Sequence, residues 1–370
     1  MIKKIIKQIE PKMNGKLLYL SQFGSHLYGL NTESSDLDFR GIYVPTINDL
    51  ILHKDKDEIN EELEVYLPPE NLVGQTHYIG EIYMEPIVSE KGKQVNCNRD
   101  NLKKADVKIF SLQKFIQLCS KADTNALDLL FSIENNFIEK YIDYNKNTTD
   151  SVIWQLYSNR GKLINTSRLE SPVKYAFKQA TKYSIKGNYV KLLDCLIALS
   201  ELLIVRNVEE FTNCFYELLV IEADKLFVVR KETKETGGSL KYLSVLGVEH
   251  PFNLSIREFS ERLKRKRAEY SGRSIEAKEQ NGNDWKALSH AIRVLLEVQE
   301  LMETGTVRFP LRQRDFLLDI KLGRVEREVI DEYFKAHLSG LMECMEQDTL
   351  GWSYDEEFWN KFIIRITKGG

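Results

Sequence analysis

The sequence has no long hydrophobic run and few cysteines, and both shortages limit what the protein can be. No apolar segment in the 370 residues approaches the roughly 20 needed to cross a bilayer. Met1–Lys7 is too short and too charged for a signal peptide. The five cysteines are odd in number and scattered, without paired or zinc-like spacing. These absences predict a soluble protein of a reducing cytoplasm with no membrane partner.

Signatures of several common enzyme classes are missing as well. The chain contains no Gly-x-Ser-x-Gly elbow, no Walker-type Gly-Lys-Ser/Thr loop and no His-Glu-x-x-His helix. A net charge of −3 with 29% charged residues is ordinary and does not indicate a nucleic-acid binder by itself. Any basic surface therefore has to be local.

The length and the hydrophobic pattern predict two domains. Residues 1–140 carry short strand-like segments separated by turns, interrupted over 45–104 by a polar insertion of uncertain shape that includes a candidate hairpin at 76–87. Residues 141–370 show helical spacing over 152–160, 173–184, 189–205, 208–228 and 285–302, after a polar linker at 143–150. The predicted fold class is α+β, with a mixed-sheet domain followed by an α-helical domain.

The most informative segment begins with a glycine and a serine after the first predicted strand. Residues 16–20 read as a strand, and Gly24 and Ser25 mark a sharp turn into a short helix. Small residues whose amides open a helix suit an anionic phosphate group. Taken alone, a Gly-Ser pair after a strand is usually only a turn.

Two aspartates follow in a second predicted strand over residues 36–44. The two-residue period of a strand places Asp36 and Asp38 on one face, where paired negative charges are costly unless a cation bridges them. Aligned carboxylates suit Mg²⁺, although an Asp-x-Asp pair is often just a solvated edge. The order of the two parts, with ten residues between Ser25 and Asp36, indicates phosphoryl or nucleotidyl transfer.

A line of cations and a histidine occupies the helix predicted over 285–302, with Asp284 as its N-cap. At about 100° per residue, Lys286, His290 and Arg293 form one stripe. The stripe either lines a cleft and binds the phosphates of a nucleotide or a nucleic acid, or faces solvent. His290 has a third interpretation as a core histidine.

A second basic cluster lies over residues 261–267, followed by Arg273. Such a run is usually a solvated helix face. The alternative is a surface that holds an RNA or DNA backbone without sequence specificity.

The opening segments resemble the signature of the DNA polymerase β-like nucleotidyltransferase superfamily. Phe23–Thr32 and Ser35–Gly41 carry this likeness, and the segments at 183–187, 285–293 and 304–311 are similar to later blocks of the RNA repair pathway DNA polymerase beta family of bacteria and phages. The resemblance implies transfer of a nucleoside monophosphate from an NTP such as ATP to a hydroxyl, with pyrophosphate leaving. It also makes RNA a more natural partner than DNA.

The superfamily has a third carboxylate on a later strand, and Asp106, at the start of a strand predicted over 105–110, is the best placed candidate. Asp100 and Asp123 are alternatives. The resemblance thus implies two Mg²⁺ or Mn²⁺ ions held by the catalytic residues Asp36, Asp38 and Asp106. The residue patterns add a nucleotide bound by Gly24 and Ser25 and, where the helical stripe lines a cleft, by Lys286, His290 and Arg293.

Two other functions compete with this prediction. One is a nucleotidyltransferase that adenylylates proteins or acts as an antitoxin. The other is a catalytically silent module that binds a nucleotide or nucleic acid, which has no chemical need for the paired carboxylates Asp36 and Asp38. The sequence leaves the nucleotide base, the acceptor, the use of a template and the oligomeric state open.

Overall fold

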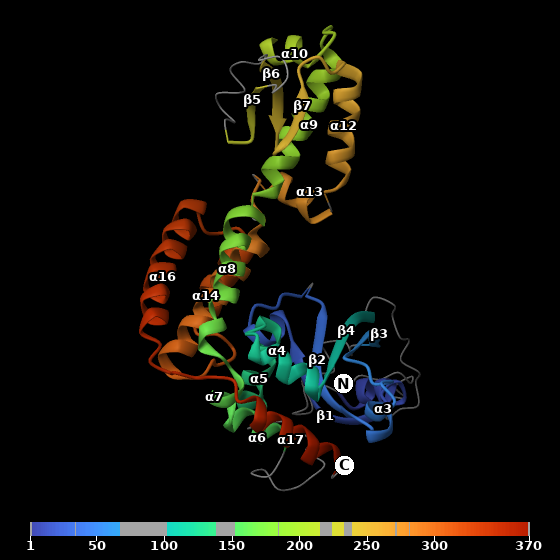
Figure 1. Ribbon diagram of the computed structural model, residues 1–370, viewed down its shortest axis with the longest axis vertical. Coiled ribbons are helices and arrows are strands. Elements are labelled where there is room, and N and C mark those ends of the chain that lie inside the picture. The colour runs from blue at the N-terminus through green and yellow to red at the C-terminus, as the bar shows by residue number, and fades with distance from the viewer. Residues whose placement is uncertain are drawn as a thin grey trace, which may run out of the picture. The chain divides into compact units, whose positions relative to one another are not determined.

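The computed structural model describes residues 2–33, 35–66, 102–137, 152–183, 185–214, 224–232, 239–270, 272–280 and 282–368 (Figure 1). The chain divides into two compact units. The first comprises Met1–Ala176, Ile292–Asp319 and Val325–Gly370, and the second comprises Phe177–Ala291 and Ile320–Arg324. This division differs from the predicted boundary at residue 140, because the chain returns to the first unit after Ala291. The predicted linker at 143–150 and the candidate hairpin at 76–87 lie outside the described residues.

The elements alternate between strands and helices at first and are mainly helical later. Those up to the end of the eighth helix are α1 (Ile2–Ile9), η1 (Glu10–Lys12), β1 (Gly15–Phe23), α2 (Ser25–Tyr28), β2 (Leu37–Pro45), α3 (Ile47–Ile51), β3 (Glu58–Tyr66), β4 (Leu102–Ser111), α4 (Leu112–Ser120), α5 (Thr124–Phe137), α6 (Val152–Ser158), α7 (Arg160–Leu163), η4 (Thr166–Arg168) and α8 (Glu170–Lys178). The later ones are the π-helical turn η5 (Gln179–Tyr183), α9 (Lys186–Leu202), α10 (Val208–Cys214), β5 (Leu226–Glu232), β6 (Ser239–Val245), β7 (Val248–Pro251), α12 (Ile256–Ala268), α13 (Gly272–Glu279), α14 (Trp285–Thr304), α15 (Arg314–Lys321), α16 (Arg327–Gln347) and α17 (Glu356–Lys368). Within the described part of the chain, no helix is long and apolar enough to span a membrane.

A four-stranded mixed sheet in the order β1-β2-β4-β3 organises the first unit. β2 runs parallel to β4, whereas β1 and β3 are antiparallel to their neighbours. The predicted class, a mixed-sheet domain followed by helices, is confirmed. One detail was wrong: Asp106 does not open its strand, because β4 begins at Leu102.

The two faces of this sheet have different roles. Phe39 of β2 and Val107 of β4 point toward one side, where they form a buried core with Ile5 and Ile9 of α1. Helix α4 contacts β2 and β4, and helix α5 contacts β1. Because side chains alternate along a strand, Asp38 and Asp106, which precede Phe39 and Val107, point away from the α1 face.

Part of the polar insertion belongs to the sheet. α3 and β3 occupy its first third, and residues 67–101 lie outside the description. Alternating Ile59 and Leu63 of β3 are buried in the core against α1, so this segment completes the sheet next to β4.

The second unit contains a sheet that the helical prediction missed. β5, β6 and β7 are antiparallel and pack on α9, α10 and α12 through a core that includes Leu193, Phe211, Leu243 and Phe259. The helix predicted over 208–228 was therefore wrong at its end, where β5 begins. The residues joining β6 and β7, Leu246 and Gly247, have φ of 51° and 81°, as a tight type I′ hairpin turn requires.

Gly187 of α9 is packed against the backbone of α13, which gives a first prediction. A Cβ atom at Gly187 would lie 2.6 Å from the carbonyl carbon of Ala277. Gly187→Ala should therefore lower the free energy of unfolding by about 1–3 kcal/mol in denaturant titrations. Gly340→Ala is the control, since no atom lies within 4 Å of its added Cβ inside α16. That variant should gain up to about 1 kcal/mol, and equal effects of the two substitutions would contradict the close packing.

Candidate active site

The site starts from the pairing of β2 with β4. Asp38 lies directly opposite Asp106 in this parallel register, and Glu62 of β3 lies opposite Asp106 on its other side. Partners in register share a face, so these three carboxylates form a row across the sheet. Asp38 is half-buried, whereas Asp106 and Asp36, which precedes β2, are exposed.

Gly24 lies directly against this row. It has φ of 62° and ψ of −142°, a combination that residues with a side chain rarely adopt. A Cβ atom there would lie only 2.2 Å from Oδ2 of Asp38. The predicted turn and short helix are present, with Ser25 opening α2. The structure therefore brings together Gly24, Ser25 and the predicted carboxylates.

The acids influence one another electrostatically. Burial raises the pKa of Asp38, and Arg40 opposes this shift. The negative charges of Asp106 and Asp36 raise the same pKa further. Asp36 and Asp106 are thus close enough to make the charge of Asp38 more costly, and a bound cation would relieve this cost.

Arg40 is a site residue that the sequence interpretation missed. Its two terminal nitrogens donate to Oδ2 of Asp106 at 3.2 and 3.3 Å, and Nη1 also donates to the carbonyl of Phe39 at 3.0 Å. The guanidinium lies over the ring of Phe23, 5.5 Å from its centroid. The two-residue period of a strand is the sequence feature that could have revealed it, because Arg40 follows Asp38 by two residues and shares its face.

The oxygen atoms of this site are ligands of the type that hard divalent cations prefer. Carboxylate oxygens such as those of Asp36, Asp38 and Asp106 are the ligands that Mg²⁺ prefers. Among the residues that the structure describes, however, no three His, Cys, Asp or Glu side chains already converge to hold a metal ion. Asp106 instead faces Arg40 and has to turn from it to become a ligand.

A buried polar cluster anchors the turn that carries Gly24. The hydroxyl of Tyr28 donates to Oδ2 of Asp128 at 2.6 Å, and Nη1 of Arg293 donates to the same oxygen at 3.0 Å. Arg293 also donates to Oε1 of Glu297 at 2.7 Å and lies 3.8 Å from the centre of the Tyr28 ring. We call these four residues the anchor cluster; all are buried, and they join α2, α5 and α14.

The anchor cluster corrects one predicted site residue. Arg293 was expected to bind nucleotide, but it is only 4% exposed and is occupied by two acids and a ring. Its place on one stripe with Lys286 and His290 could not reveal this, because a helical period does not tell a buried stripe from an exposed one. Lys286 is exposed and His290 is partly buried in the second unit, and their role in nucleotide binding stays a prediction.

The segment after α14 also packs on the opening motif. The ring of Phe309 lies 5.8 Å from that of Tyr28, and the amide of Leu311 donates to the carbonyl of Tyr28 at 3.3 Å. Gly29 follows with φ of 76°, and a Cβ there would lie 2.9 Å from Pro310. Segments nearly 300 residues apart in sequence thus fix one turn.

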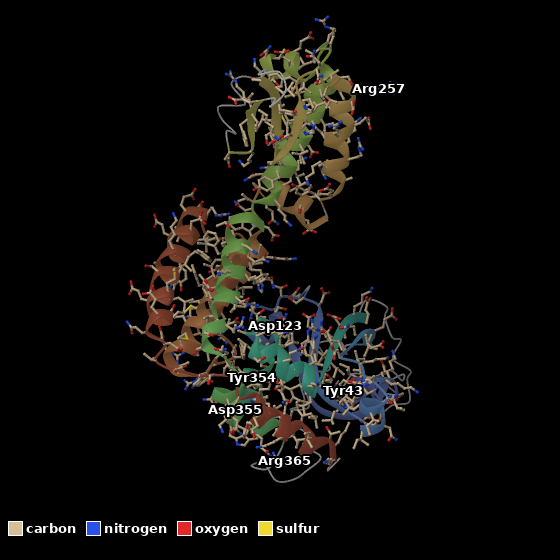
Figure 2. The ribbon with its side chains drawn as sticks, viewed as in Figure 1. Tyr43, Asp123, Arg257, Tyr354, Asp355 and Arg365 are labelled. Carbon is tan, nitrogen blue, oxygen red and sulfur yellow. The ribbon has the colours of Figure 1, made fainter. Side chains whose placement is uncertain are left out.

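Of the two alternatives to Asp106, Asp123 has another role in the structure. Asp123, labelled in Figure 2, accepts a hydrogen bond from the amide of Ala126 at 3.1 Å and so caps α5. Asp100 lies outside the described residues. Asp106 is therefore the one of the three that the described structure places beside Asp38.

The basic run at 261–267 is largely neutralised within the second unit. It lies on α12, which Arg257 marks in Figure 2. Four of its cations form ion pairs with acids, namely Arg262 with Glu258, Lys264 with Glu201, Lys266 with Glu269 and Arg267 with Asp194. This pairing favours the interpretation as a solvated helix face.

Comparison with known proteins agrees with the opening motif. Residues 1–70 match the RNA repair pathway DNA polymerase beta family, which confirms the predicted resemblance for this segment. The chain is also similar to an uncharacterized 38.9 kDa protein from the nrdC-mobD intergenic region of Enterobacteria phage T4, with 26% identity over 380 residues that cover 95% of this chain and 97% of the phage protein. No solved structure matches the chain. The matched segment contains Gly24, Ser25, Asp36 and Asp38, but not Asp106.

Removing the guanidinium from the anchor cluster should destabilise the protein. Arg293→Ala leaves Asp128 buried without its cation, so we expect a loss of about 3–5 kcal/mol in the free energy of unfolding. Chemical denaturation measures it. Arg206→Ala, which removes an exposed partner of Glu210, is the control and should leave stability almost unchanged. A stable Arg293→Ala protein that had lost only nucleotide affinity would restore the original prediction.

Glu297 predicts how stability depends on pH. Burial raises the pKa of Glu297 from 4.5 to about 8. Between these values the native state keeps a proton that the unfolded chain has lost, so the free energy of unfolding falls as pH rises. The slope of this contribution approaches about 1.4 kcal/mol per pH unit. Glu297→Gln should flatten the curve between pH 5.5 and 7.5, and parallel curves for the two proteins would contradict the buried protonated acid.

Proposed function

We propose that the protein is a metal-dependent nucleotidyltransferase that moves a nucleoside monophosphate from an NTP to a hydroxyl of RNA. One observation carries the proposal: Asp38 and Asp106 face each other on adjacent strands, and Gly24 packs directly against Asp38. The family match over residues 1–70 supports the same chemistry, and the RNA repair pathway in the family's description favours RNA as the acceptor class.

Asp36, Asp38 and Asp106 are the residues that would hold Mg²⁺ or Mn²⁺. When bound, two such ions lower the pKa of the attacking hydroxyl and neutralise charge on the leaving pyrophosphate. The excess of carboxylates on one face of the sheet supports this assignment, since a cation relieves their repulsion. Asp106 joins the set once it turns from Arg40.

The protein's own groups orient the nucleotide in this proposal. The absence of a side chain at Gly24 lets phosphate oxygens approach the backbone beside Asp38. The amide and hydroxyl of Ser25 donate to the β and γ phosphates. The anchor cluster holds Tyr28, and with it the turn, in a fixed place, so these donors need no rearrangement when negative charge develops.

The chemistry is tested by following nucleotide transfer directly. Protein is incubated with each α-³²P-labelled NTP, Mg²⁺ or Mn²⁺, and RNAs that end in a free hydroxyl. Because Asp38 is the central ligand of the proposed ions, Asp38→Ala should reduce label transfer by more than about 100-fold. Asp57→Asn is the matched control, since it removes an exposed acid that pairs with Lys114 elsewhere in the same unit.

Each result decides between the candidate functions. Transfer to RNA that is lost in Asp38→Ala and kept in Asp57→Asn supports the proposal. Label on protein in place of RNA assigns the adenylylating or antitoxin-type activity. NTP binding without any transfer indicates a silent binding module, and transfer that survives in Asp38→Ala rules out the assigned residues.

A further inference from the structure

We propose that Arg40 is an internal counter-ion for Asp106 that competes with the divalent cation for this carboxylate, so that the cation binds tightly only together with the negatively charged triphosphate. This inference rests on the proposed function, because it concerns the same carboxylates. It adds an order to the reaction: the metal ion and the nucleotide enter together.

The contacts of Arg40 hold its guanidinium in place. Its side chain is only 16% exposed and has two partners besides Asp106, the carbonyl of Phe39 and the ring of Phe23. The side chain of Asp106, in contrast, is 56% exposed. When the pair separates, Asp106 is therefore the side chain that moves, and the guanidinium stays beside the site.

Ion pairs within the protein also neutralise other acids of the row. Glu62, the next acid in the row, pairs with Lys104 of the neighbouring strand, as Asp106 pairs with Arg40. Two of the three acids in the row are thus already paired within the protein, and Asp38 keeps its excess negative charge beside them. A divalent cation has to replace an existing ion pair and then remain close to a fixed positive charge, which weakens its binding.

A bound triphosphate removes the unfavourable effect of Arg40 on cation binding. Its negative charges offset the fixed charge of Arg40, and the nitrogens that Asp106 releases become donors for an anion. The affinity for a cation that binds together with the triphosphate is therefore not lowered by Arg40. The Arg40–Asp106 pair therefore disfavours a free cation and accepts one bound to nucleotide.

The test is an EPR titration of the full chain with Mn²⁺ in the absence of nucleotide. Arg40→Gln should bind Mn²⁺ about tenfold more tightly than the natural protein, because one positive charge near the ion is gone. Arg40→Lys keeps the positive charge near the ion and should therefore stay within about twofold of the natural protein. Lys12→Gln is the matched control, since Lys12 pairs with Glu61, 2.5 Å away, on the α1 face of the sheet.

Circular dichroism verifies that each variant is folded. If Arg40→Gln does not fold, Arg40→Met preserves the packing of the stem on Phe23 and carries the same expectation. The gain should shrink in an Arg40→Gln/Asp106→Asn double variant, where no carboxylate remains to compete for. An Mn²⁺ affinity in Arg40→Gln that is unchanged or weaker overturns the inference.

The outcome separates this inference from the proposed function. Tighter Mn²⁺ binding in Arg40→Gln with no transfer by the natural protein leaves Arg40 as the counter-ion and removes the transferase. Transfer that depends on Asp38, together with an unchanged Mn²⁺ affinity in Arg40→Gln, keeps the transferase and removes the counter-ion. A natural protein that binds no Mn²⁺ at this site even when a non-hydrolysable NTP is present removes both.

Discussion

The position of the opening turn depends on one buried interaction, the contact of Arg293 with Asp128 and Tyr28. A single oxygen of Asp128 accepts from both partners, and the guanidinium also covers the ring of Tyr28. Burying these charges is tolerable because each is compensated, and Glu297 keeps its proton at neutral pH since burial raises its pKa to about 8. Helices α2, α5 and α14 are thereby held around Gly24–Tyr28.

The row of acids on the sheet follows the opposite electrostatic design. The anchor cluster is buried and close to neutral, which gives a fixed position but no chemistry. Asp38 and Asp106 are more accessible and share their face with Asp36, so negative charge accumulates where a cation and a triphosphate can enter. Stability and proposed catalysis thus rest on two neighbouring charge groups that Tyr28 and Gly24 connect through a single short helical turn.

Local features were predictable from the sequence, and long-range ones were not. The strand, turn, helix and second strand around Gly24 and Asp38 follow from patterns within about 30 residues. β3 was hidden because the alternation of Ile59 and Leu63 runs through many charged residues. The buried state of Arg293 depends on Asp128, 165 positions away, and no periodicity reports such a contact. The pairing of Arg40 with Asp106 likewise depends on strand register rather than on spacing along the chain.

The most direct test of this account is a crystal structure of the protein with Mn²⁺ and a non-hydrolysable NTP, using anomalous scattering to locate the metal. The account predicts anomalous peaks bounded by Asp36, Asp38 and Asp106, with Asp106 turned from Arg40 and the triphosphate against Gly24 and Ser25. A nucleotide bound elsewhere, or a complex in which Asp106 still pairs with Arg40 and no peak lies beside Asp38, would contradict it.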